Sequence, residues 1–231
     1  MNTLFSKMTG SALDLLFPLE CAGCQKQGAV LCGSCLQEAP RLKAPYCRLC
    51  GQPGHTSPCG TCREIPLAIH GIRAPFILEG PVRHVIHHLK YRNLRAAAPQ
   101  LGQILGEHLR THRMPGSLLV PVPLHASRLR QRGYNQSELL AKAASQTSEI
   151  PLEPRLLSRT KNTQPQVESQ GRDQRRANVE GSFKCRSALT GVSVILIDDV
   201  ATTGSTLSAC AAALKAAGAE SVWGLVLARE A

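Results

Sequence analysis

Aromatic residues make up only 3% of this 231-residue chain, and long apolar runs are missing from it. A surface that binds nucleic acid mainly by stacking bases on aromatic rings is therefore not expected. No run approaches the ~20 apolar residues that a membrane-spanning helix requires, which argues against an integral membrane protein. Acidic residues are also few, since 16 Asp and Glu stand against 27 Lys and Arg.

The positive charge is concentrated in one part of the chain. Between Arg83 and Arg186 there are 18 Lys and Arg against seven Asp and Glu, which equals the whole formal excess of +11. A basic surface of this size suits a polyanion, either a nucleic acid or a small polyphosphate. A basic surface that only keeps the protein soluble would give the same count of charges. Charge alone therefore does not distinguish a polyanion-binding surface from a solubilising one.

Residues 1–20 form a candidate N-terminal segment. Leu13, Leu16 and Phe17 make it partly apolar, but Asp14 interrupts the apolar run and no small-residue cleavage site follows. This pattern argues against a secretory signal peptide. It favours a short amphipathic helix that packs onto another surface, with weak contact to a membrane surface as the lesser alternative.

Cysteine is the residue type that stands out, with ten in the chain. Eight of them form four Cys-x-x-Cys pairs, namely Cys21 and Cys24, Cys32 and Cys35, Cys47 and Cys50, and Cys59 and Cys62. Such pairs in a chain without a signal peptide are typical of metal ligands in a reducing compartment, which predicts a cytoplasmic protein. Because Zn²⁺ prefers four soft ligands in a tetrahedron, eight thiolates predict two closed, structural Cys₄ sites.

The cysteine-rich segment is predicted to be a small zinc-ribbon domain over residues 21–66. About 45 residues bury too little apolar surface to fold alone, so bound metal would supply the folding free energy. The simplest arrangement joins neighbouring pairs into one site, and a cross-braced arrangement fits the same spacing. Redox-active cysteines are a weaker alternative, because a thioredoxin-like pair occurs once in a βαβ unit rather than four times in tandem.

The remaining residues, 67–231, are predicted to form one larger domain in which strands and helices alternate. We expect strands over residues 72–78, 118–122, 192–197 and 221–227, and helices over residues 82–89, 96–112, 136–146 and 205–217. Pro75 places the first strand at a sheet edge. Residues 90–93 are expected to form a loop, and residues 148–190 a long loop with short elements. The alternation predicts an α/β fold with a parallel sheet flanked by helices.

The segment after the strand at 192–197 carries the strongest functional signal. Two adjacent carboxylates, Asp198 and Asp199, precede a hydroxyl- and glycine-rich turn and then an Ala- and Leu-rich helix. The turn comprises Ala201, Thr202, Thr203, Gly204, Ser205 and Thr206. Backbone N–H groups at a helix N-terminus favour a phosphate, and carboxylates accept hydrogen bonds from a diol such as ribose, directly or through a divalent ion. The pattern predicts a phosphoribosyl site rather than an ordinary turn with a solvated acidic pair.

Together these motifs resemble the ComF/GntX family of competence-associated, phosphoribosyltransferase-like proteins over nearly the full length of the chain. The likeness rests on the Cys-x-x-Cys module, Leu89-Lys90-Tyr91, Val120 to His125 with Arg132 to Gln136, and Ile197 to Gly204. It implies a type I phosphoribosyltransferase-like fold preceded by a double zinc ribbon. It also implies a role in natural transformation, in which members assist incoming single-stranded DNA on the cytoplasmic side of the inner membrane, or in the use of DNA as a nutrient.

The resemblance also assigns roles to basic residues outside the acidic pair. Leu89-Lys90-Tyr91 resembles the loop that contacts pyrophosphate, often through a cis peptide, which makes Lys90 the cation for that group. A second segment resembles the mobile loop that closes over the reacting centre and stabilises departing pyrophosphate, with Arg159, Lys161, Gln166, Arg172 and Arg176 as its candidate residues. The implied ligand is phosphoribosyl pyrophosphate, or a related sugar phosphate, bound with Mg²⁺.

Arg128, Arg130 and Arg132 stand beside Tyr134 and predict a track for a nucleic-acid backbone with one aromatic stacking platform. Three functions stay open at this point. The chain could be a phosphoribosyltransferase, active or degraded, whose acceptor is unnamed because no general base is visible. It could be a DNA-uptake accessory whose basic face binds single-stranded DNA and whose zinc module binds a partner such as a DNA translocase or helicase. It could also be a regulator that senses phosphoribosyl pyrophosphate.

Overall fold

The computed structural model describes residues 19–55, 57–160 and 181–231. The helix predicted over residues 1–20 lies almost wholly outside these ranges, as do Lys161, Gln166, Arg172 and Arg176 of the predicted mobile loop. Within the described ranges no helix has the length and apolar character to cross a membrane.

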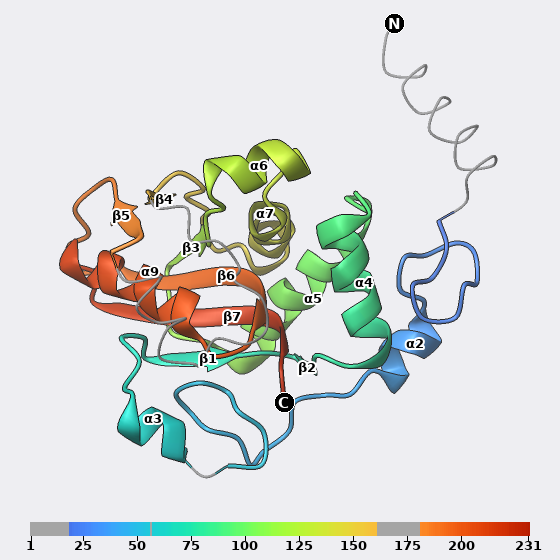
Figure 1. Cartoon of the computed structure of the whole chain (residues 1–231), viewed down its shortest axis with the longest axis horizontal. Coiled ribbons are helices and arrows are strands. Elements are labelled where there is room, and N and C mark those ends of the chain that lie inside the picture. The colour runs from blue at the N-terminus through green and yellow to red at the C-terminus, as the bar shows by residue number, and fades with distance from the viewer. Residues whose placement is uncertain (1–18, 56, 161–180) are drawn as a thin grey trace, which may run out of the picture.

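A five-stranded parallel sheet forms the centre of the larger domain (Figure 1). Its strands lie in the order β1 (Gly71–Arg73), β7 (Ser221–Arg229), β6 (Ser193–Ala201) and β3 (Leu118–Pro121), and β2 (Phe76–Ile77) also pairs with β7. Every pairing in this sheet is parallel. The predicted parallel α/β sheet is therefore confirmed, and the strand that Pro75 divides lies at the sheet edge as expected.

Strand β6 is longer than predicted. Its pairing with β7 continues from Ile197 opposite Leu225 to Ala201 opposite Arg229. Both acidic residues therefore lie inside the strand, near its carboxyl end, rather than in the turn that follows. The ladder of backbone hydrogen bonds fixes the positions from which their side chains extend.

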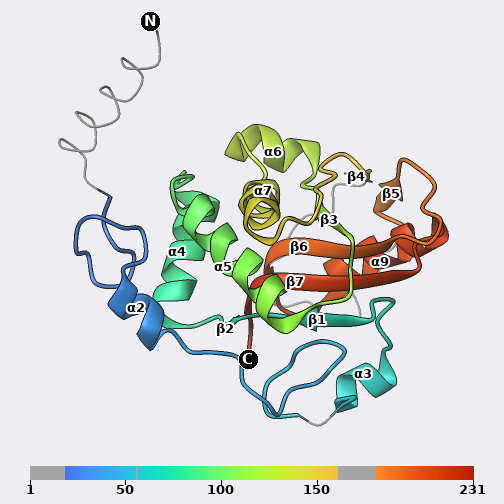
Figure 2. The same cartoon turned by 180° about the vertical axis from the view of Figure 1, so that it is seen from behind.

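Helices cover both faces of the sheet (Figures 1 and 2). On one face lie α4 (Gly80–Tyr91), α5 (Ala97–His112) and α7 (Gln136–Ser148), and on the other lies α9 (Ser205–Ala216). Each of these helices was predicted from the sequence. Helix α6 (Ala126–Arg132) was not expected, because none of its residues is buried and its sequence has no apolar period. Its N-cap is His125, whose Nδ1 accepts a hydrogen bond from Ser127 N–H, and its C-cap is Gly133 with φ 78°.

Helices α5 and α7 approach each other closely at two glycines. A Cβ atom on Gly102 would lie 2.5 Å from Ala143 Cβ and 2.6 Å from the Leu140 carbonyl oxygen, and one on Gly106 would lie 2.5 Å from Thr147 Cβ. Only glycine allows this approach without a shift of the helices. The packing holds α7 in place, and Ser137 in the first turn of α7 donates a hydrogen bond to Asp198 of β6.

Lys90 and Tyr91 form the end of α4, so the loop predicted over residues 90–93 is wrong for these two residues. The chain leaves the helix at Arg92, and Asn93 adopts a left-handed φ of 54°. Among the residues with described positions, the cis peptide bonds precede Pro45 and Pro58. The cis peptide that the resemblance implied near Lys90 is therefore not found there.

The loop predicted over residues 148–190 contains a second, two-stranded sheet. Strand β4 (Leu157–Arg159) pairs antiparallel with β5 (Phe183–Cys185). Arg159 therefore lies in a strand, with its guanidinium carbon 5.3 Å from the centre of the Phe183 ring. This corrects the assignment of Arg159 to a mobile loop.

The two cysteine modules lie at separate places on the larger domain (Figure 1). The first, which includes α2 (Gly33–Glu38), lies beside α4 and α5, and the Gln100 side chain exchanges two hydrogen bonds with the Leu31 backbone at 3.3 and 2.6 Å. The second, which includes α3 (Gly60–Glu64), lies beside β1, where Ile72 N–H donates to the Leu49 carbonyl oxygen at 2.9 Å. Each module therefore packs against a different part of the sheet and its helices.

Candidate functional site

The 201–206 loop joins the carboxyl end of β6 to the first turn of α9. Gly204 is the N-cap of α9, with φ 76° and no side-chain cap, and a Cβ there would lie 2.8 Å from Ile72 Cδ1. Thr203 Oγ1 accepts a hydrogen bond from Ser205 N–H at 3.3 Å and lies 2.8 Å from Ser205 Oγ. The loop gathers hydroxyls beside the amides of a helix N-terminus, which is an arrangement that binds phosphate.

Asp199 is buried at the carboxyl end of β6 and forms an ion pair with Lys90, whose Nζ lies 3.0 Å from Asp199 Oδ1. Burial disfavours the charged ammonium, but the carboxylates of Asp199 and Asp198 outweigh burial and raise the pKa of Lys90. The other oxygen of this carboxylate, Oδ2, is buried without a hydrogen-bond partner. An unpaired buried oxygen costs free energy, which a ligand hydroxyl or a cation would recover.

Asp198 has different surroundings. Its Oδ1 accepts hydrogen bonds from Ser137 Oγ at 2.7 Å and from Asp199 N–H at 2.9 Å. Burial, followed by the charge of Asp199, raises the pKa of Asp198 to about 7. The two carboxylates are therefore not equivalent, since one is paired with a cation and the other titrates near neutral pH.

Arg159 on β4 is a predicted basic residue whose pKa is shifted by its surroundings. Burial, and then the positive charge of Arg128, lowers the pKa of Arg159, while the charge of Asp198 acts in the opposite direction.

Helix α6 carries Arg128, Arg130 and Arg132, none of them buried. Tyr134 does not fit its predicted role as a stacking platform, because its side chain is only 7% exposed and its hydroxyl donates to the Leu89 carbonyl oxygen. The guanidinium of Arg95 lies 4.5 Å from the centre of the ring. The prediction is therefore wrong for Tyr134.

Tyr91 is an aromatic residue that the sequence reasoning did not assign to nucleic acid. It is 67% exposed at the end of α4, and the guanidinium carbon of Arg132 lies 5.7 Å from the centre of its ring. The ring of His87, one helical turn earlier, lies 4.9 Å away. The i, i+4 spacing of His87 and Tyr91 would have revealed this exposed pair if the predicted helix had been extended by two residues.

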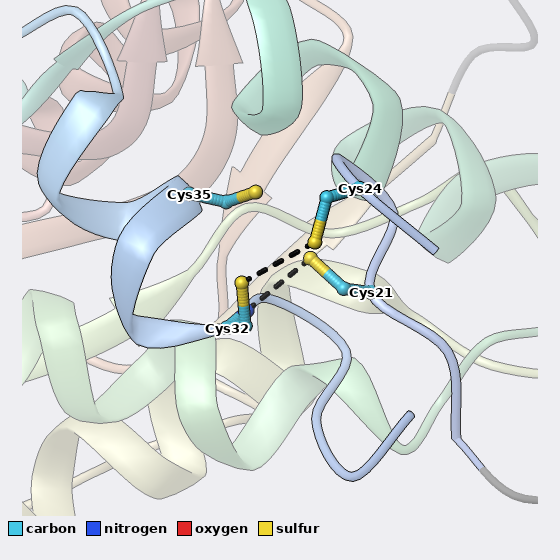
Figure 3. A group of neighbouring side chains, drawn as sticks. All are labelled: Cys21, Cys24, Cys32 and Cys35. Atoms are coloured by element: carbon cyan, nitrogen blue, oxygen red, sulfur yellow. Dashed lines mark hydrogen bonds between the residues drawn. The ribbon is translucent and has the colours of Figure 1, made fainter. Parts of the chain in front are cut away.

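Each cysteine module brings four sulfur atoms within 4.8 Å of one another. The first cluster is Cys21, Cys24, Cys32 and Cys35, drawn in Figure 3, and the second is Cys47, Cys50, Cys59 and Cys62. The predicted pairing of neighbouring Cys-x-x-Cys motifs is therefore confirmed, and the cross-braced alternative does not apply. With four cysteines at each site no coordination position stays open, which fits structural zinc.

Backbone amides favour the thiolate form of one cysteine in each cluster, Cys21 and Cys47. Cys21 Sγ accepts hydrogen bonds from Gly23 N–H at 3.4 Å and from Cys32 N–H at 3.3 Å, the second of which is drawn in Figure 3. In the other cluster Cys47 Sγ accepts one from Cys59 N–H at 3.4 Å. Burial by itself would raise the pKa of Cys47, but the amide hydrogen bonds lower it to about 6. Thiolate is the form that binds Zn²⁺, so the donor set fits the metal.

The parallel sheet, the acidic strand end with its hydroxyl-rich loop, and the two Cys₄ clusters together define a phosphoribosyltransferase-like protein with a double zinc ribbon. Two family models agree with this class. The double zinc ribbon domain matches residues 12–65, and the phosphoribosyl transferase domain matches residues 135–231. A solved purine phosphoribosyltransferase from Pyrococcus horikoshii is 20% identical, with a TM-score of 0.36 over 57% of this chain and 72% of that chain.

Curated relatives narrow the class to one family. Competence protein F of Haemophilus influenzae is 32% identical over 219 residues, which cover 89% of this chain and 89% of that protein. DNA utilization protein YhgH of Salmonella typhi is 31% identical over 199 residues, which cover 83% of this chain and 87% of that protein. The chain belongs to the ComF/GntX family that these relatives represent.

Proposed function

We propose that this protein binds phosphoribosyl pyrophosphate, with Mg²⁺, at the carboxyl end of β6, and that it supports the handling of incoming single-stranded DNA in natural transformation or in the use of DNA. The observation that carries the proposal is the buried, unpaired Oδ2 of Asp199, which lies in the strand that leads into the 201–206 loop. A phosphate cradle beside an unsatisfied diol acceptor matches the two ends of a ribose 5-phosphate.

Each part of the ligand has a counterpart in this site. The amides and hydroxyls of the 201–206 loop would hold the 5-phosphate, and Asp199 Oδ2 would accept a ribose hydroxyl. Lys90, already 3.0 Å from Asp199 Oδ1, would meet the pyrophosphate with its ammonium. Asp199 Oδ2 is also the hard oxygen ligand that Mg²⁺ takes, usually one carboxylate together with substrate phosphates and water.

The DNA part of the proposal rests on a second surface and on the relatives. Helix α6 offers Arg128, Arg130 and Arg132 without an acidic residue in its sequence, and exposed Tyr91 lies beside Arg132. Cations that follow a backbone next to an aromatic face are the elements of single-strand binding. The names of the relatives, a competence protein and a DNA utilization protein, support the same role, and a DNA translocase or helicase is the partner we propose for it.

A second candidate function is transfer of the phosphoribosyl group to an acceptor. Asp198 favours it, because a carboxyl group with a pKa of about 7 is suited to accept a proton at neutral pH. The same site without turnover would act as a sensor of phosphoribosyl pyrophosphate.

Calorimetry of the whole chain tests the proposal. We expect phosphoribosyl pyrophosphate to bind in the presence of Mg²⁺, and Asp199→Asn, which keeps the shape of the side chain, to weaken binding at least tenfold. Glu153→Gln is a matched acid-to-amide control, because Glu153 is exposed and lies outside the site. Equal affinity of Asp199→Asn and the unaltered chain would overturn the assignment.

A further inference from the structure

A cavity of about 250 Å³ lies beside β1 and the first residues of β7, away from the candidate site at the end of β6. Trp223, which lines it, pairs with Ile195 near the start of β6. The lining also includes Tyr46, the residue before Cys47 of the second cysteine module, and His108 of α5. Since drug-sized sites take about 300–1,000 Å³, a ligand of this cavity would be a small molecule.

Arg73 is the only Lys or Arg among the described residues that line this cavity, and no described Asp or Glu lines it. Its Nη1 donates to the Arg48 carbonyl oxygen at 2.7 Å and to the Ile72 carbonyl oxygen at 2.9 Å. Its Cζ lies 5.1 Å from the centre of the Trp223 ring and 5.7 Å from that of Tyr46. The guanidinium is therefore held in position before a ligand binds, which lowers the entropy cost of binding.

The other edge of this guanidinium, formed by Nε and Nη2, has no hydrogen-bond partner in the described part of the chain. No Asp or Glu within the described ranges forms an ion pair with Arg73 either. The N–H bonds of Nε and Nη2 point in the same direction, so this edge is a two-pronged donor that matches the two oxygens of a carboxylate. Arg73 is half-buried, and a partly shielded cation without a counter-ion costs free energy that a bound anion would recover.

The electrostatic surroundings of the cavity favour one negative charge. Burial, and then the positive charge of His112 and of two arginines, Arg73 among them, lowers the pKa of His108 to about 4. His108 is therefore uncharged at neutral pH, and Arg73 is the permanent cation of the lining. One guanidinium suits a carboxylate better than a phosphate monoester, whose charge at neutral pH is about −1.5 to −2. The aromatic and aliphatic walls suit a flat, apolar body attached to that carboxylate.

We propose that this cavity is a binding site for a small aromatic carboxylate. The carboxylate would accept two hydrogen bonds from Nε and Nη2 of Arg73, and the ring would pack against Trp223. Tyr46 precedes Cys47 of the second Cys₄ cluster and Trp223 lies in the sheet, so the second cysteine module must be docked to complete the site. The site is separate from the one proposed for phosphoribosyl pyrophosphate and does not depend on it.

Fluorescence of the unaltered, zinc-loaded chain gives the first test, because Trp223 is the single tryptophan in the sequence and lines the cavity. The probe is benzoate, with benzamide as an uncharged molecule of the same shape and phenyl phosphate as a more highly charged one. We expect benzoate to saturate the site at millimolar concentrations, and the other two to bind at least tenfold more weakly. Absence of saturation with benzoate, by fluorescence and by calorimetry, would overturn the site. Benzamide or phenyl phosphate that binds as tightly as benzoate would overturn the carboxylate assignment.

A pair of substitutions gives the second test. Arg73→Lys keeps the charge but removes the two-pronged edge, so the affinity for benzoate should fall at least tenfold. Arg63→Lys is the matched control, because Arg63 is exposed on α3 and lies outside the lining residues, and it should leave the affinity unchanged. Unchanged zinc content in both variants would show that the cysteine modules are intact. Benzoate affinity that zinc-loaded Arg73→Lys leaves unchanged would overturn the proposal, and the comparison with benzamide decides it if Arg73→Lys loses zinc.

Discussion

Lys90 Nζ lies 3.0 Å from Asp199 Oδ1, and this ion pair joins the end of α4 to the carboxyl end of β6. The two side chains are 22% and 4% exposed, so the pair is largely shielded from water. The candidate site therefore depends on a helix that is more than 100 residues away in sequence. The same pair gives the first prediction.

Replacing Lys90 with Met keeps most of the apolar stem and removes the charge. Asp199 would then be buried without a cation, which typically costs about 3 kcal/mol of unfolding free energy. The double variant Lys90→Met with Asp199→Asn should recover most of that loss, because no unpaired charge remains. Urea unfolding measures both, and a Lys90→Met chain as stable as the unaltered one would contradict the ion pair.

The pKa of Asp198 predicts how stability depends on pH. It is raised to about 7 in the folded chain, against ~3.9 in an unfolded chain. The folded state therefore retains a proton that the unfolded state has lost, and this carboxyl lowers the free energy of unfolding as pH rises from about 4 to about 7.

Asp198→Asn isolates this effect, because it keeps an oxygen acceptor for Ser137 and removes the titration. The free energy of unfolding of the variant, minus that of the unaltered chain, should increase as pH rises and then level off above about 7. Both chains hold the same cysteine clusters, so metal-linked changes cancel in the difference. A difference that is constant from pH 5 to pH 8 would mean that Asp198 does not titrate there.

Tyr91 is predicted to contribute to single-stranded DNA binding by stacking. Loss of one stacked base costs about 1–3 kcal/mol, so Tyr91→Ala should weaken binding of a short oligonucleotide roughly five- to 160-fold. Tyr91→Phe keeps the ring and should bind as the unaltered chain does. Fluorescence anisotropy at low salt measures this, and equal affinity of the Ala and Phe variants would exclude Tyr91.

Arg130 on α6 is predicted to contact a phosphate of the DNA. Arg130→Gln should then reduce the dependence of log affinity on log salt concentration by about 0.7, the value for one lost phosphate contact on a single strand. Arg110→Gln on the last turn of α5 removes the same charge from another exposed helix position and should leave the slope unchanged. If the two variants showed the same dependence of log affinity on log salt concentration, the DNA backbone would not follow α6.

The contact between α5 and α7 gives a prediction for stability. Gly102→Ala would put a methyl group within 2.6 Å of the Leu140 carbonyl oxygen, and overpacking of this kind costs about 1–3 kcal/mol. Gly33→Ala is the control, because a Cβ there meets nothing within 4 Å. Thermal unfolding should place Gly102→Ala clearly below Gly33→Ala, and the reverse order would contradict the packing.

Features that depend on neighbouring residues in the chain could be predicted from the sequence. The spacing of the cysteines determined the two Cys₄ clusters, because each Cys-x-x-Cys turn supplies two ligands locally. The apolar run, the acidic pair and the glycine of the 201–206 loop likewise predicted β6 and α9. The end of α4 was not predicted correctly, because the turn that follows the helix is marked by a single residue, Asn93, in the left-handed region.

Features that depend on distant contacts could not be predicted. Tyr134 is buried because its hydroxyl reaches the Leu89 carbonyl oxygen, 45 residues earlier. Arg229 joins Cys50 to the end of the sheet across 179 residues, and no local pattern indicates such a contact. Helix α6 was missed because none of its residues is buried. Without a buried face, its sequence lacks the apolar residues at helical spacing from which a helix is predicted.

The separate positions of the two cysteine modules have a consequence for cells that are starved of zinc. A half-loaded molecule would exist in two forms, since either metal centre could be the one left without its ion. One form would lose support beside α4 and the other beside β1 and Arg229, so the two would fail in different ways at equal metal content. Total metal analysis would not distinguish these populations, whereas proteolysis of the two segments would.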